Sequence, residues 1–275
     1  MKKTLITILL FTITITGFSQ KKPKIKGNRN VTEISKEITE AFGTIEIDDA
    51  LEVTLYQGDQ NEYYLKTDEN LIDIIQFKVQ DDILKIYATN KIVRSKKLKI
   101  DVTITDINQI ILRDHAQITI NKKLSTKEVT INAYDSSQFD LSIEADDIAI
   151  MLYDKVKGLV NIKSESATLE MNGKADVRGT IKTDKIKTSL IRSTRLKLDG
   201  NADIATFDLK GSAKLNAKKM KIGSINLKTS NTADVNIYAR KELELHARDK
   251  SVVYIYGNPK IDVKNLTEAS KIIKK

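Results

Sequence analysis

Three aspartates stand at matching places in turn-like stretches of the chain, Asp114, Asp135 and Asp154, at intervals of 21 and 19 residues. If these turns stack on one another, the carboxylates come close together and supply the several oxygen ligands that Ca²⁺ requires. An aspartate in a turn also accepts hydrogen bonds from nearby backbone amides, and that role needs no metal. We favour the turn role, keep calcium as the weaker alternative, and expect no other cofactor.

Basic and aromatic side chains indicate a second kind of chemistry, the binding of an anionic ligand. Lysine and arginine are frequent after residue 178, where they could attract an acidic polysaccharide or another cell-surface protein. Two tyrosines at matching positions could stack on sugar rings, although an aromatic ladder within a sheet has the same pattern. A solvated surface is the alternative for the basic residues. The candidate ligand surface comprises Tyr134, Tyr153, Lys182, Lys187, Arg192, Arg195, Lys197 and Lys214.

Catalytic residues are not indicated by the sequence. Glycoside hydrolysis requires two carboxylates at a set separation, whereas the acids of this chain are scattered among the repeats. The two histidines, His115 and His246, have no evident partner, and there is no cysteine for a nucleophile, a disulfide or a thiolate metal site. We therefore expect a protein that is not an enzyme.

The elements that must position these residues follow from a repeat. Eight positions recur every 18 or 19 residues, and seven of them hold a large apolar residue. Each lies within a run that alternates apolar and polar positions, such as Val129, Ile131 and Ala133. Period-two alternation predicts a strand with one buried face. A similar run precedes each of these, so every unit has two strands and two turns. The apolar ladder comprises Ile131, Ile150, Leu169, Thr188, Phe207, Ile225, Leu243 and Ile261.

A short unit with one apolar face can bury that face only by stacking on near-copies of itself. The sequence therefore predicts an all-β, single-stranded β-helix (solenoid), with about eight rungs of 18–21 residues over 113–265. The general preference of parallel crossovers favours a right-handed coil. Asp, Asn, Gly and Ser at the unit boundaries predict turns that tolerate left-handed backbone angles. Gly179 and Thr188 occupy positions at which neighbouring rungs have larger side chains, so we expect a void or a register shift there.

Residues 35–112 alternate less regularly and predict a β-rich entry module, continuous with the repeats in one domain over 35–265. Within this module, Asp81 and Asp82 lie between two alternating runs and predict the turn of a hairpin. The stretch 69–75 has a short helical pattern.

Both ends of the chain have their own composition. Residues 1–19 have the charged start, apolar run and small residues of a secretory signal peptide. Residues 20–34 are basic without apolar periodicity and predict a flexible leader, and residues 266–275 predict a polar tail. We expect an exported protein, whether periplasmic, cell-surface or secreted, with no transmembrane segment after signal cleavage. Without cysteine it is not a cysteine-anchored lipoprotein, and export together with sparse aromatics excludes nucleic acid as a partner.

The formal net charge is +9, and it is unevenly distributed. Residues 31–177 hold 17 basic and 27 acidic side chains, whereas residues 178–275 hold 22 basic and 10 acidic ones. If the solenoid is linear, its two ends have opposite sign. Such a charge distribution predicts self-association that is sensitive to salt.

Several sequence motifs resemble those of one family of exported bacterial proteins. They are Phe42-Gly-Thr-Ile45-Glu-Ile47, Val53-Thr-Leu55-Tyr56-Gln57-Gly58, Val79-Gln-Asp-Asp-Ile-Leu84 and Val253-Tyr-Ile255-Tyr256-Gly257-Asn258-Pro259. The chain is similar to the auto-transporter adhesin head domains, also called GIN domains, over about 35–265. The resemblance implies a right-handed β-helix in an exported protein of Bacteroidota-like bacteria, with adhesion as its role. It implies no catalytic residues.

These observations favour a non-enzymatic, exported β-helix scaffold for adhesion or surface interaction, with a protein or a polysaccharide as its ligand. A carbohydrate-active periplasmic protein and an envelope structural protein are the alternatives.

Overall fold

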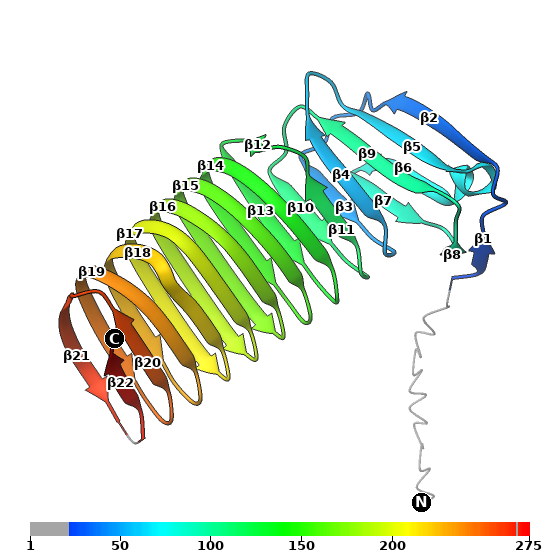
Figure 1. Cartoon of the computed structure of the whole chain (residues 1–275). Coiled ribbons are helices and arrows are strands. Elements are labelled where there is room, and N and C mark those ends of the chain that lie inside the picture. The colour runs from blue at the N-terminus through cyan, green and yellow to red at the C-terminus, as the bar shows by residue number, and fades with distance from the viewer. Residues whose placement is uncertain (1–21, 268) are drawn as a thin grey trace, which may run out of the picture.

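The computed structural model describes residues 22–267 and 269–275, which form an N-terminal β-rich module followed by a long solenoid (Figure 1). The expected signal peptide over 1–19 lies outside the described residues. The fold is all-β, with about nine turns of solenoid over 109–274. The sequence prediction of an all-β solenoid preceded by a β-rich module is therefore confirmed.

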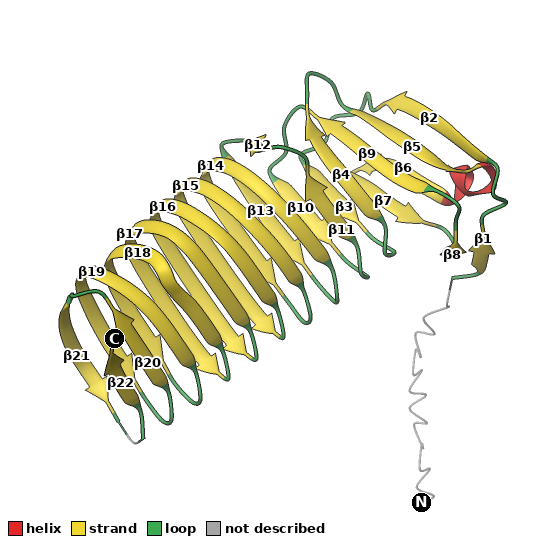
Figure 2. Cartoon of the chain, viewed as in Figure 1, coloured by secondary structure: helices red, strands yellow, loops and turns green. Residues whose placement is uncertain are grey.

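The solenoid is one continuous parallel stack, and strands up to 17 residues long wrap around it (Figure 2). Its strands are β10 (Gln109–Leu112), β11 (Gln117–Ile120), β12 (Leu124–Ser125), β13 (Glu128–Ala133), β14 (Gln138–Leu152), β15 (Lys157–Gly173), β16 (Asp176–Arg192), β17 (Arg195–Gly211), β18 (Lys214–Thr229), β19 (Asp234–Ala247), β20 (Val252–Tyr256), β21 (Lys260–Leu266) and β22 (Lys271–Lys274).

Each long strand covers two faces of the solenoid. In its first half every second residue points inward, and near its middle this alternation shifts by one residue. In β15 the buried positions are 158, 160 and 162, and after the middle they are 167, 169 and 171. A strand that bends there keeps both halves directed at the same interior. We call the outward side of residues 157–163 and its equivalents the first face, and that of residues 166–172 and its equivalents the second face.

The apolar ladder is confirmed from Ile131 to Phe207, where the five residues pair in register through Ile150, Leu169 and Thr188. Beyond Phe207 the predicted ladder is wrong by two residues. Phe207 pairs with Leu227, and Leu227 pairs with Leu245, whereas Ile225 and Leu243 continue the neighbouring column from Ala205. The physical reason is that β18 contains extra residues, so the register shifts on both of its sides.

The register shift expected in the rung of Gly179 and Thr188 is not observed, because β16 pairs with β15 and β17 without any shift. Thr188 is fully buried. Gly179 lies in the column of Val160 and Leu198, where a Cβ atom would stand 1.8 Å from the carbonyl oxygen of Val160. The absence of a side chain at residue 179 therefore lets the two backbones approach closely.

One corner of the solenoid is built from residues with positive φ, as the turn chemistry predicts. We call this the left-handed corner. Its residues occupy equivalent places in successive rungs and are Asp114, Asp135, Asp154, Gly173, Arg192, Gly211, Asn231 and Asp249. Small buried residues such as Ala175, Thr194 and Ala213 fill the interior just after this corner.

The entry module continues the stack, since β3 (Thr44–Ile47) pairs with β10 and β4 (Glu52–Gln57) pairs with β11. Its other elements are β5 (Glu62–Asp68), the 3₁₀ helix η1 (Glu69–Ile74), β6 (Ile75–Gln80), β7 (Ile83–Ala88), β8 (Lys91–Arg94) and β9 (Leu98–Ile104). The predicted hairpin is confirmed by the antiparallel pairing of β6 and β7, with Asp81 and Asp82 at positive φ in its turn.

Strand pairing extends beyond the expected limits at both ends. The described part of the predicted flexible leader contains β1 (Lys24–Lys26), which pairs with β8, and the start of β2 (Val31–Glu37), which pairs with β5. Part of the predicted polar tail forms β22, which pairs with β20. The physical reason is that Ile25, Ile34 and Ile272 are each partly buried, so apolar contact supports both segments despite their charged composition.

Candidate ligand-binding face

The first face is basic along four successive rungs, β15 to β18. On these strands its acidic side chains are Asp176 and Asp199, and every other charged side chain there is a cation. The cations are Lys157, Lys163, Arg178, Lys182, Arg195, Lys197, Lys214, Lys218, Lys219 and Lys221, all exposed. Because adjacent rungs are about 4.8 Å apart, cations of neighbouring rungs lie close together, in columns that also hold neutral residues and the two acids. We call this surface the basic face.

Two shallow grooves follow the basic face. The first, of about 570 Å³, is lined by Lys157, Leu159, Arg178 and Arg195 together with residues of β11 and β14. The second, of about 320 Å³, continues from it along Arg195 to Lys214. Leu159 is 51% exposed between the polar columns. Around this apolar side chain the first groove offers the cations Lys157 and Arg178, and Asp140 and Asp176 also line it.

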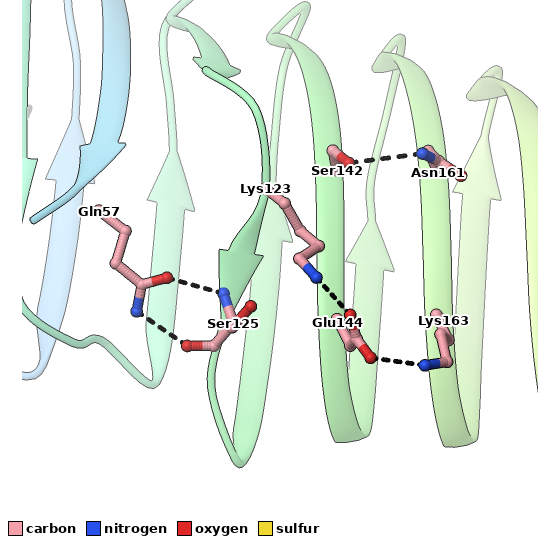
Figure 3. Close-up of polar contacts among 7 residues, drawn as sticks. All are labelled: Gln57, Lys123, Ser125, Ser142, Glu144, Asn161 and Lys163. Carbon is pink, nitrogen blue, oxygen red and sulfur yellow. Dashed lines mark hydrogen bonds and ion pairs between the residues drawn. The ribbon is translucent and has the colours of Figure 1, made fainter.

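The few acids nearby neutralise only part of this charge. Asp176 contacts Arg195 at 2.9 Å and Arg178 at 3.7 Å. Glu144 binds Lys123 and, at 2.7 Å, Lys163, as Figure 3 shows. The hydrogen bonds from Lys123 and Lys163, with their charges, lower the pKa of Glu144 to about 2. Within the described residues, Lys157, Lys182, Lys197 and Lys214 have no ion-pair partner.

The junction between the entry module and the solenoid lies beside Glu144 (Figure 3). The Gln57 side chain accepts a hydrogen bond from the Ser125 amide at 2.9 Å and donates to the Ser125 carbonyl at 2.8 Å. It thus pairs with the β12 backbone as another strand would, and it ties β4 to the first rungs.

The structure separates the predicted ligand residues into three groups. Lys182, Arg195, Lys197 and Lys214 lie together on the basic face. Lys187 lies on the second face, and Arg192, Tyr134 and Tyr153 lie at the left-handed corner. The eight residues therefore do not form one surface, because strand alternation and the bend of each rung direct them to different sides.

Sequence reasoning missed Lys157 and Arg178, which line the first groove. The 19-residue spacing carries the signal that could have found them. Lys157, Asp176, Arg195 and Lys214 are each 19 residues apart and share one column. Steps of the same size lead from Leu159 through Arg178 to Lys197.

The two predicted tyrosines stack on each other. Their ring centroids lie 5.3 Å apart with an interplanar angle of 7°, and the Arg113 guanidinium covers the Tyr134 ring at 4.5 Å. Arg113, Tyr134 and Tyr153 thus form a ladder across three rungs, which stabilises the stacking of the rungs at the left-handed corner. Tyr153 is 37% exposed at the end of this ladder.

The three aspartates proposed for calcium occupy the left-handed corner, where one carboxylate has a structural partner. Asp135 accepts a hydrogen bond from the Asp114 backbone amide at 3.2 Å, across the rungs rather than within its own turn. Asn231 and Asp249 make the same contact with the amides of Gly211 and Asn231, at 3.1 and 2.6 Å. In the part of the chain that the structure describes, no three His, Cys, Asp or Glu side chains are arranged to hold a metal ion.

The histidines lie in separate rungs. His115 follows the corner residue of the first rung, between β10 and β11, whereas His246 is in β19 near the other end (Figure 1). His246 contacts Glu244 of its own strand at 3.5 Å. The two side chains cannot act on one bond.

A sequence profile of one protein family matches residues 41–157 and again 153–259, which together cover most of the chain. The family is described as putative auto-transporter adhesin, head GIN domain. The chain belongs to this family. No curated protein sequence matches it.

Solved structures agree with the GIN-domain fold. A putative adhesin of Parabacteroides distasonis is 16% identical, with a TM-score of 0.71, covering 91% of this chain and 99% of the other. A putative adhesin of Parabacteroides merdae is 18% identical, with a TM-score of 0.69, covering 92% and 99%. A putative lipid binding protein of Parabacteroides distasonis is 19% identical, with a TM-score of 0.65, covering 91% and 96%. At these identities the likeness establishes the fold alone.

Over residues 22–267 and 269–275, the GIN-domain protein has no helix with the length and apolarity needed to cross a membrane.

Proposed function

We propose that this GIN-domain protein is a non-enzymatic, exported adhesion scaffold that binds an acidic polysaccharide along the basic face. The observation that carries the proposal is the excess of exposed cations on the basic face, where ten lysine and arginine side chains of β15 to β18 stand beside two acids, Asp176 and Asp199. Export is supported by the adhesin family and by the signal-like residues 1–19.

The geometry favours a long polyanion over a small ligand. The grooves are shallow and cross several rungs, so a bound chain could contact each rung in turn. Regularly spaced charges give affinity through many weak contacts, and salt weakens such contacts. The exposed Leu159 offers an apolar contact to a sugar ring.

The test is the binding of polygalacturonate, a polymer of carboxylated sugars, to the purified protein by biolayer interferometry. Replacing Lys197 and Lys214 together with glutamate reverses two unpaired charges on the basic face. We expect affinity to fall by about tenfold or more, and wild-type affinity to decrease as salt is raised.

The matched control replaces Lys187 and Lys228 with glutamate, which makes the same charge change on exposed positions of the second face. Affinity in this variant should stay close to that of the wild type. An equal loss in both variants would show that net charge alone, and not the basic face, governs binding. Hydrolysis of the polymer during the assay would contradict the non-enzymatic role.

A further inference from the structure

A second group of cations surrounds a pocket of about 420 Å³ in the entry module, at the N-terminal end of the described chain. Its lining residues are Lys26, Gly27, Arg29, Arg94, Ser95 and Lys96. They come from two segments far apart in the sequence, the chain after β1 and the chain at the end of β8, which lie side by side (Figure 1). None of the lining residues is acidic.

A buried carboxylate holds these two segments together. Asp68 is inaccessible to solvent and accepts hydrogen bonds from the amides of Arg29 and Lys96 at 3.1 Å and of Lys97 at 3.4 Å. Gly27 fits tightly over it, since a Cβ atom there would stand 1.8 Å from an Asp68 carboxylate oxygen.

Further bonds fix the segment after β1. The Gly27 amide donates to the Arg94 carbonyl at 2.8 Å. The Asn70 side chain accepts from the Asn28 amide at 2.8 Å and donates to the Lys26 carbonyl at 2.9 Å. Arg29 has a φ of 70°, a left-handed conformation that is unfavourable for arginine. Hydrogen bonds therefore fix the backbone of both segments that line the pocket.

The lining cations of the pocket exceed the acidic side chains near it, since Asp68 is the one carboxylate that contacts the lining segments among the described residues. Burial acts to raise the pKa of the Asp68 carboxyl, but the hydrogen bonds from the Lys96, Arg29 and Lys97 amides outweigh it, and the pKa lies below its ordinary value. Asp68 thus remains charged, but its oxygens are engaged by the backbone. Within the described residues, the side chains of Lys26, Arg29, Arg94 and Lys96 have no ion-pair partner, and the Ser95 hydroxyl has no hydrogen-bond partner.

We propose that this pocket binds a phosphate group. Two guanidinium groups can each donate two parallel hydrogen bonds to phosphate oxygens, and lysine ammonium groups add point charges. A phosphate monoester carries a charge of about −1.5 to −2 at neutral pH, which matches the four cations that line the pocket better than a single carboxylate does. The pocket lies in the entry module and the basic face lies on the solenoid, so this proposal is independent of polysaccharide binding.

The test is titration calorimetry of the purified protein with inorganic phosphate in a phosphate-free buffer. We expect saturable binding that weakens by about tenfold or more when Arg94→Gln and Lys96→Gln are combined. These changes remove two side-chain charges and leave the backbone bonds to Asp68 and Gly27 in place. The control combines Lys36→Gln and Lys78→Gln, two exposed lysines of the same module outside the pocket, and should bind phosphate as the wild type does.

A second measurement distinguishes a lipid headgroup from a soluble phosphate compound. Cosedimentation uses phosphatidylcholine vesicles with and without phosphatidic acid. Pocket-dependent binding to the phosphatidic acid vesicles, together with phosphate binding, supports the proposal with a lipid as the source. Pocket-dependent binding of phosphate alone supports it with a soluble source. The proposal is overturned if the wild type shows no saturable phosphate binding, or if both double variants lose it equally.

Discussion

Thr188 is a hydroxyl residue in the innermost apolar column, between Leu169 and Phe207. Its side-chain oxygen is buried and has no hydrogen-bond partner among the residues that the structure describes. A buried hydroxyl without a partner lowers stability, because its bonds to water are lost on folding and are not replaced. The sequence pattern identified this position as unusual, and the structure shows that the anomaly lies in the chemistry of the residue and not in the register.

We expect Thr188→Val to stabilise the protein by about 1–2 kcal/mol, since valine has nearly the same shape and no polar atom to bury. Chemical denaturation would measure the change in the free energy of unfolding. Thr168→Val, at a partly exposed position of the second face in the preceding rung, is the control and should have little effect. Destabilisation by Thr188→Val would mean that the hydroxyl has a partner.

Asp48 is a second residue with a buried side-chain oxygen that lacks a hydrogen bond within the described residues, and it lies between β3 and β4. One of its carboxylate oxygens is buried and accepts no hydrogen bond from any residue in 22–267 or 269–275. Burial, and then the negative charges of Glu46, Asp49 and Asp114, raise its pKa from 3.8 to about 6. Between these two values the folded state binds more protons than the unfolded state, so this group makes stability fall as pH rises.

Asp48→Asn should therefore stabilise the protein above about pH 7 by roughly 1–3 kcal/mol. Below about pH 3 the aspartate is protonated in both states, and the difference between variant and wild type should disappear. Melting temperatures recorded across this pH range would test both points. A difference that is independent of pH would show that charge on Asp48 is not the cause.

At the scale of elements, the left-handed corner is stabilised in two ways. Residues that tolerate positive φ allow each rung to turn, and the side chains of Asp135, Asn231 and Asp249 bond the backbone amide of the previous rung. The turns can be predicted from single residues, because Asp, Asn and Gly adopt a positive φ more easily than other residues do. The bonds between rungs depend on stacking, which no single rung specifies.

Substitutions of Asp249 can separate the contribution of the hydrogen bond between rungs from that of the backbone conformation. Asp249→Ala removes the 2.6 Å bond to the Asn231 amide and also places a Cβ-bearing residue without a polar group at a φ of 61°. We expect it to destabilise the protein by about 1–3 kcal/mol. Asp249→Gly removes the same bond without the backbone strain and should cost less. Equal effects of the two substitutions in thermal melting would show that strain contributes nothing.

At the scale of the whole molecule, charge is unevenly distributed along the chain. The segment 31–177, with 27 acidic and 17 basic side chains, precedes the segment 178–275, with 10 acidic and 22 basic ones. Parallel stacking converts this order along the sequence into an order in space, since each rung lies beside the next (Figure 1). We therefore expect the two ends of the molecule to attract each other in neighbouring molecules.

We expect association at low ionic strength that dissociates as salt is added, because exposed charges are screened within about 10 Å at moderate salt. Sedimentation velocity at low and high salt would measure it. The Lys197→Glu and Lys214→Glu double variant, which weakens the positive half, should associate less than the wild type. A monomer under all conditions would remove this expectation.

The sequence alone determined the all-β solenoid, the residues that face its interior up to Phe207, and the corner turns. These features depend on alternation and spacing within a few residues, which are local properties of strands and turns. Tertiary structure decided what depends on contacts between distant residues. Extra residues in β18 shift the pairing beyond Phe207, and the bend of each rung places Lys182 and Lys187 on different faces. Asp68 joins two segments that composition alone describes as unrelated basic stretches, because hydrogen bonds across the fold leave no periodic signal in the sequence.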